Sequence, residues 1–219
     1  MAAEGIPGYE NAFGVLRQLA RRPRNVEHCE LCSVPLPGGH PHLLEPIGRE
    51  LLCACDACAL LFSGRAGAKF KRVPRRVRLL ANFHMNDAQW DSLMLPINMA
   101  FLFRSSPEGR MVAMYPSPAG ATESLLNLES WGEIVQENHE LNTMEADVEA
   151  LLVNRIGHAR GFSAPEYYIL PIDECFKLVG LIRLHWKGFS GGTEVWQEIA
   201  HFFEELKGKA MVPAGGAHA

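Results

Sequence analysis

Five of the six cysteines fall within thirty residues, and their spacing constrains the fold more than any other feature of the sequence. Cys29 and Cys32 form one Cys-x-x-Cys pair, Cys55 and Cys58 form a second, and 22 residues separate the two pairs. Each pair brings two thiolates onto one tight turn, and two such turns facing each other complete a tetrahedral site. The spacing therefore predicts a small, zinc-ribbon-like metal-binding knuckle.

The metal is predicted from the ligand type. A closed set of four thiolates suits a structural Zn²⁺ that holds a segment too small to bury its own core. The same thiolates could hold one iron, as in a rubredoxin, or part of an iron–sulfur cluster. Rubredoxin knuckles usually carry glycine after the second cysteine of each pair, whereas Ser33 and Ala59 stand there in this chain. Zinc is favoured, with iron as the alternative and plain buried cysteines as a third interpretation.

Cys53 is a fifth thiol without an assigned role. If residues 51–55 form a strand, Cys53 and Cys55 point to the same face, and Cys53 could replace a ligand or exchange with one. His40 and His42 are additional or alternative ligands, although a place beside the ligands or on the surface is favoured for both. Spare ligands of this kind would suit a metal carrier rather than a permanent structural site.

Charge divides the chain into two parts. Residues 21–80 carry 11 Lys and Arg against 5 Asp and Glu, which leaves 10 basic and 20 acidic residues elsewhere. The net charge of −4 thus combines a basic N-terminal unit with an acidic C-terminal one.

A basic run after the cysteines is a candidate partner-binding surface. It contains Lys71, Arg72, Arg75, Arg76 and Arg78. Beside a zinc knuckle this run suggests nucleic-acid binding, with phosphates as ligands. Its alternation with valines is more typical of an exposed strand, so a solvated face or a contact with acidic protein is favoured. The acidic C-terminal unit is itself one such partner.

We expect an α+β protein in four parts. They are an N-terminal helical extension (1–24), a Cys-rich metal-binding module (25–66), an α+β domain (67–208) and a disordered tail (209–219). The module should contain a hairpin over 42–52, and the larger domain about four strands and four helices. Strands are expected at 98–104, 110–115, 167–170 and 178–186, with a β-like segment at 77–83; helices are expected at 89–95, 128–138, 144–156 and 194–207.

The sequence contains no recognisable catalytic constellation. Cys175 and His185 could form a nucleophile and base, but their spacing matches no known arrangement, and a buried thiol in a strand is favoured. The glycine-rich turn at 187–193 could receive an anion, although a tight turn into a helix explains it better.

Apolar runs are too short to span a membrane, and residues 1–20 lack a secretory signal. A cytoplasmic location follows, where thiols stay reduced.

Two blocks of sequence resemble a known family. The N-terminal block comprises CELC (29–32), HPHLL (40–44) and LCACDACALLF (52–62); the C-terminal and more specific block comprises PIDECFKLVGLIR (171–183) and WKGFSGGTEVW (186–196). Over about residues 25–208 the chain resembles an uncharacterised bacterial family, a domain of unknown function encoded near genes for high-affinity, actinobacterial-type nickel–iron hydrogenases.

The resemblance implies no catalytic residues, because the family has no established activity. Its gene neighbourhood implies a role in hydrogenase maturation, assembly or electron supply. We therefore expect a non-enzymatic accessory protein that binds hydrogenase subunits or their maturation factors. The alternatives are an iron-thiolate redox or metal-transfer protein and a zinc-knuckle nucleic-acid-binding regulator.

Overall fold

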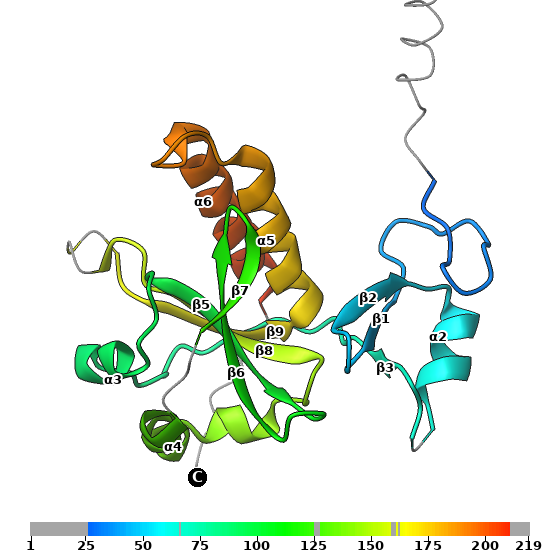
Figure 1. The fold of residues 1–219 in the computed structure, drawn as a ribbon, viewed down its shortest axis with the longest axis horizontal. Coiled ribbons are helices and arrows are strands. Elements are labelled where there is room, and N and C mark those ends of the chain that lie inside the picture. Colours follow the sequence, from blue (N-terminus) through cyan, green and yellow to red (C-terminus); the bar gives the residue numbers. More distant parts are fainter. Residues whose placement is uncertain (1–25, 66, 125–127, 159–160, 162, 211–219) are drawn as a thin grey trace, which may run out of the picture.

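A computed structural model describes residues 26–65, 67–124, 128–158, 161 and 163–210. The chain forms a small Cys-rich unit beside a larger α+β body (Figure 1). The helical stretch expected within 1–24 and the tail beyond residue 210 lie outside the described residues. The predicted α+β class is confirmed.

The Cys-rich unit is a three-stranded antiparallel sheet with one short helix. Its strands are β1 (His42–Glu45), β2 (Glu50–Cys53) and β3 (Lys71–Arg72), in the order β2-β1-β3, and its helix is α2 (Asp56–Ser63). The hairpin expected over 42–52 is therefore present. β3 follows residue 66, so the small sheet continues past the boundary expected there.

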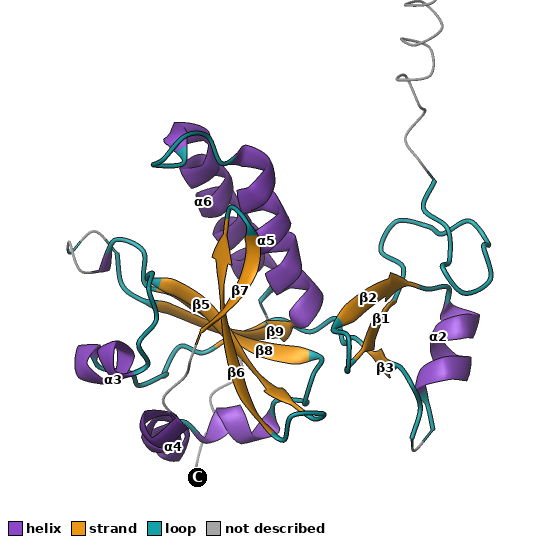
Figure 2. Ribbon diagram, viewed as in Figure 1, coloured by secondary structure: helices purple, strands orange, loops and turns teal. Residues whose placement is uncertain are grey.

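The body is built on one six-stranded antiparallel sheet (Figure 2). Its order is β4-β9-β8-β5-β6-β7, and the strands are β4 (Arg78–Leu79), β5 (Met99–Ser105), β6 (Arg110–Ser117), β7 (Gly120–Ser124), β8 (Glu149–Asn154) and β9 (Glu166–Pro171). The predicted hairpin of β5 and β6 and the predicted strand at 167–170 are confirmed. The sheet has six strands rather than the expected four. Strand β4 lies within the β-like segment expected at 77–83, β7 and β8 were not predicted as strands, and the strand expected at 178–186 does not belong to this sheet.

Helices cover both faces of this sheet, so its central strands are buried on both sides. Helices α5 (Ile172–His185) and α6 (Gly192–Lys209) pack on one face, with Phe101, Leu152 and Leu170 among the sheet residues beneath them. The opposite face meets α3 (Asp87–Ser92), α4 (Leu128–Glu137) and a 3₁₀ turn, η1 (His139–Thr143). Within the described part of the chain, no helix is both long and apolar enough to cross a membrane.

Residues 144–156 were expected to form a helix, and this expectation is wrong. Residues 149–154 form the central strand β8 instead. Leu151 and Val153 face one core while Ala150 and Leu152 face the other, which is the two-residue alternation of a strand. A strand that is covered on both faces has a continuous apolar run in its sequence. The apolar residues of this run also matched the spacing of a helix, which is why a helix was predicted.

The strand expected at 178–186 is also wrong, because this segment is the C-terminal part of α5. The buried side chains of α5 are Ile172, Cys175, Leu178, Val179 and Ile182, and they follow helical spacing. Gly180 and the apolar residues around it resembled a strand. Cys175 is buried as expected, but in a helix rather than a strand.

The other helices of the body, α3, α4 and α6, lie in segments expected to be helical, whereas α2 of the Cys-rich unit was not expected. α4 and α6 occupy the predicted segments. The N-cap of α3 is Asn86, and its side chain forms a capping box with Gln89. Trp196 of α6 is 45% exposed.

Several contacts join the Cys-rich unit to the body. Leu44 of β1 is 2% exposed and belongs to the core beneath α5 and α6. Arg49, in the turn between β1 and β2, pairs with Glu108 and Glu123, and its guanidinium lies 5.5 Å from the centre of the Phe103 ring. These contacts place the hairpin of the Cys-rich unit directly against the sheet of the body.

Candidate metal centre

The two Cys-x-x-Cys pairs lie on different kinds of turn. Cys29 and Cys32 belong to a loop in which the Ser33 amide donates to the Cys29 carbonyl over 2.7 Å, and Ser33 has a φ of 62°. Cys55 is the N-cap of α2, and its Sγ accepts from the Cys58 amide at 3.4 Å. The second pair therefore straddles the start of a helix, where backbone N–H groups favour negative charge.

The structure brings the four cysteines together. The Sγ atoms of Cys29, Cys32, Cys55 and Cys58 all lie within 4.8 Å of one another, and Cys32 Sγ is 3.8 Å from Cys55 Sγ. A tetrahedron with metal–sulfur bonds of about 2.3 Å has sulfur–sulfur edges of about 3.8 Å. The four thiols thus lie at a separation that could hold a metal ion. Cys29 and Cys58 are buried, whereas Cys32 is exposed.

The electrostatics of the cluster fit a cation site. Burial opposes ionisation of Cys29, but backbone N–H groups led by that of Cys55 outweigh it and lower the pKa to about 6. Burial, together with hydrogen bonds to the neighbouring thiols, raises the pKa of Cys58 to about 12. The Cys29 thiolate is therefore favoured, whereas burial and the neighbouring thiols oppose ionisation of Cys58. A bound divalent cation would stabilise the thiolate form of all four cysteines, so their remaining protons would be released on binding.

Cys53 is separated from the four-cysteine cluster. Strand β2 ends at Cys53, and Cys55 already caps α2, so the condition under which both thiols would share one face, a strand over 51–55, is not met. Cys53 instead lies opposite His42 in the β1–β2 pair and forms a second cluster with His40 and His42. Burial and the nearby carboxylates, Glu30 first, raise the pKa of its thiol.

His42 connects the second cluster to the body. Its Nδ1 lies 2.6 Å from Oδ2 of Asp173, in the first turn of α5. This hydrogen bond raises the pKa of His42. Asp173 did not stand out in the sequence, because 131 residues separate it from His42.

The five basic residues of the expected partner surface all contact acceptors within this chain. Lys71 pairs with Asp147, Arg72 lies 3.6 Å from Asp56, Arg75 donates to the Gly39 carbonyl, Arg76 pairs with Glu145 and Glu149, and Arg78 donates to Thr143. Much of the basic charge is thus opposed by acidic residues of the body. Binding of protein or nucleic acid by this run stays a prediction.

Cys175 and His185 are not brought together. Both lie on α5, ten residues or about 15 Å apart along its axis. Cys175 is fully buried, which raises the pKa of its thiol well above the ordinary value. His185 instead contacts Glu194 at 3.0 Å.

The glycine-rich segment before α6 is a tight turn. The Lys187 amide donates to the Gly191 carbonyl, and Gly191 has a φ of 84°. A Cβ at Gly191 would lie 2.8 Å from the Val195 side chain, so both backbone conformation and space require glycine. Phe189, at the tip, is completely exposed.

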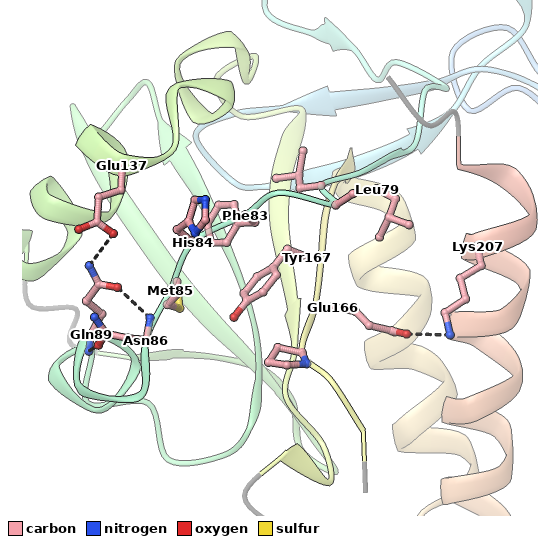
Figure 3. A pocket seen from close by; sticks show the side chains of 13 residues that line it. Leu79, Phe83, His84, Met85, Asn86, Gln89, Glu137, Glu166, Tyr167 and Lys207 are labelled. Carbon is pink, nitrogen blue, oxygen red and sulfur yellow. Dashed lines mark hydrogen bonds and ion pairs between the residues drawn. The ribbon is translucent and has the colours of Figure 1, made fainter. Parts of the chain in front are cut away.

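The body also contains two cavities that the sequence did not indicate, because each is lined by segments far apart in the chain. One, of about 670 Å³, lies between the loop before α3, β9 and α6 (Figure 3). Its charged lining includes the Glu166–Lys207 ion pair at 2.7 Å, and Glu137 accepts from Gln89 at 3.0 Å. The other, of about 730 Å³, is largely apolar and lies beside Trp186 and Trp196.

Fold and site together define an α+β protein with a Cys-rich unit in which four clustered thiols could hold a metal ion. Residues 28–210 match a family described as a family of unknown function, DUF5947, and the chain belongs to this family. No curated protein and no solved structure matches the chain. The expectation of an uncharacterised family is therefore confirmed.

Proposed function

We propose that this protein is a non-enzymatic, cytoplasmic accessory protein whose Cys-rich unit is held by a structural tetrathiolate zinc site. Through protein–protein contacts it would assist the maturation or assembly of a nickel–iron hydrogenase. The observation that carries the metal part is the convergence of four Sγ atoms within 4.8 Å. The hydrogenase part rests on the resemblance to a family encoded near hydrogenase genes.

The small core of the Cys-rich unit supports a structural role for the metal. Its six buried residues include two of the ligands and two alanines: Cys29, Leu36, Leu43, Ala54, Cys58 and Ala59. So little apolar surface offsets only part of the entropy lost on ordering the segment. A metal bound by four thiolates would contribute the missing free energy of folding.

Exposed apolar side chains support a role in protein contacts. Phe189 and Leu184, 108% and 77% exposed, lie in the turn before α6 and near the end of α5. Leu60 and Leu61, on α2, are 67% and 59% exposed. These side chains are available for contact with a partner, and the 187–193 turn is our preferred docking segment.

Metal analysis with a visible spectrum tests the structural site. Protein isolated without added metal should be colourless and contain at least one zinc per chain. Cys32→Ser should lower the zinc content, whereas His139→Ala, at an exposed histidine outside both clusters, should leave it unchanged. Absorption between about 350 and 500 nm, with iron in place of zinc, would instead support the iron-thiolate alternative.

Co-purification tests the partner. The protein should associate with hydrogenase subunits or their maturation factors in cells that are assembling the enzyme. Phe189→Ser should weaken that association without changing the zinc content, because Phe189 follows the C-terminal end of α5, whereas the Cys-rich unit contacts the first turn of that helix. Failure to associate at any stage of maturation would rule out the hydrogenase role and leave the zinc site untouched.

A further inference from the structure

His40, His42 and Cys53 form a second cluster whose members are separate from the four clustered cysteines. A ring nitrogen of each histidine and the Cys53 Sγ all lie within 4.8 Å of one another. The two rings are 5.0 Å apart and nearly perpendicular, at 86°. Pairing of β1 with β2 sets this geometry, because it places His42 directly opposite Cys53.

His40 has a buried nitrogen that forms no hydrogen bond within the described part of the chain. Its side chain is only 6% exposed, and Nδ1 donates to the Pro37 carbonyl over 3.1 Å. Nε2 is buried and has no hydrogen-bond partner among the described residues. With the proton on Nδ1, Nε2 carries a lone pair, and leaving such a group unsatisfied costs free energy. A metal ion would satisfy it.

His42 is oriented in the same manner. Its Nδ1 is held by Asp173 at 2.6 Å, which leaves Nε2 as the nitrogen that can bind a metal. Histidines that bind metals almost always donate their other N–H to a carboxylate or backbone carbonyl, which fixes tautomer and ring orientation. Here His42 has the carboxylate and His40 has the carbonyl.

We propose that His40, His42 and Cys53 form a second metal site, for a borderline divalent cation such as Zn²⁺, with one coordination position open. Two imidazoles and one thiolate suit such a cation, and sites with three protein ligands leave the fourth position to water or an incoming ligand. The His42 side chain is 33% exposed, so solvent can reach the site. The proposal of a second metal site is independent of the proposed hydrogenase role, because every residue of the site belongs to this chain.

The two sites therefore have different characters. The four cysteines make a closed set, which holds its metal without an exchangeable position. The second site has fewer ligands, is open, and takes its orienting carboxylate from Asp173 of the body. We assign exchange or delivery of metal to this second site, and the structural role to the four cysteines.

Cobalt binding to the full-length protein, loaded with only one equivalent of zinc so that the four cysteines are filled first, tests the proposal. The wild-type protein should take up one further equivalent of Co²⁺ and develop the visible bands of a tetrahedral site. Cys53→Ser and His40→Ala should abolish this uptake while keeping the zinc of the four cysteines. His139→Ala, the exposed control, should bind cobalt as the wild type does.

Asp173→Asn provides a variant outside the Cys-rich unit. It keeps the side chain's shape but weakens the acceptor for His42, so cobalt should bind about 10- to 100-fold more weakly. Adding free imidazole to the cobalt form should shift its bands; an unshifted spectrum would overturn the open position. No uptake by the wild type, unchanged uptake by Cys53→Ser, or loss of both metals in Cys53→Ser would each overturn the second site.

Discussion

Single buried polar residues connect the Cys-rich unit to the body. Asp147 is 2% exposed, has a φ of 72°, and accepts from Lys71 Nζ and from the backbone and hydroxyl of Ser106. Burial opposes its ionisation, but the contacts with Lys71 and Ser106 outweigh that effect and hold its pKa below the ordinary value. The carboxylate therefore stabilises the fold while it is charged.

We expect Asp147→Asn to lower the free energy of unfolding by about 2 kcal/mol at pH 7, because a charged hydrogen-bonding group is lost. Asn tolerates the same positive φ, so backbone strain does not contribute. A carboxyl with a depressed folded-state pKa stabilises fully above its unfolded value, near 4, and loses that effect as pH falls through the folded value. The difference between the two proteins in urea unfolding should therefore shrink below about pH 4.

Asp91→Asn is the matched control for this prediction. Asp91 is exposed, so the same chemical change should alter stability by less than about 0.5 kcal/mol. A gap between Asp147→Asn and the wild type that stayed constant down to pH 2 would contradict a role for the charged carboxylate.

Among the elements, α5 determines how the two parts of the molecule meet. Its first turn supplies Asp173, its buried side packs on the sheet and on α6, and its last turns carry exposed side chains. The acidic residues in its first turn and the basic ones in its last are placed favourably against the helix dipole. One helix thus combines a core function with a polar contact to the Cys-rich unit.

Two leucines on α5 test its orientation. Leu178 is 0% exposed, and Leu178→Ala should lower the free energy of unfolding by about 2–5 kcal/mol through lost packing and a cavity. Leu184 is 77% exposed, so the same substitution there should change stability by less than about 0.5 kcal/mol. Thermal unfolding of both variants measures the contrast, and equal effects would contradict the helix described here.

Local patterns predicted the parts of the structure that local forces determine. The β1–β2 and β5–β6 hairpins and helix α6 follow from turns and periodic apolar residues, and the four clustered cysteines from their spacing. β8 and α5 were misassigned because tertiary burial decides between helix and strand for short apolar runs. The cluster of Cys53 with His40 and His42 depends on the register of β1 and β2. The hydrogen bond between His42 and Asp173 depends on a contact between residues 131 positions apart. No local pattern encodes either.

At the scale of the molecule, the two parts rely on different forces. The body buries two extensive cores, on the two faces of one sheet, whereas the Cys-rich unit has a small core that includes Cys29 and Cys58 of the four-cysteine cluster. The body should therefore persist without metal, while the Cys-rich unit should not.

A strong chelator should unfold the Cys-rich unit selectively. Hydrogen exchange should accelerate in α2 and in the loop of Cys29 and Cys32, because metal binding supplies much of their stability. Amides of β5 and β8 should keep their protection. Simultaneous loss of protection in both parts would show that the metal stabilises the whole chain as one unit.

The third strand of the small sheet has a practical consequence for anyone who would isolate the Cys-rich unit. β3 pairs with β1, and Val73 and Val77, just after it, are buried in the core of the body. Ending the chain at residue 66 would remove β3 and leave one edge of β1 unpaired. Its exposed backbone N–H and C=O groups would then favour self-association. The segment that carries the four clustered cysteines is therefore shorter than the segment that could be isolated with its sheet intact.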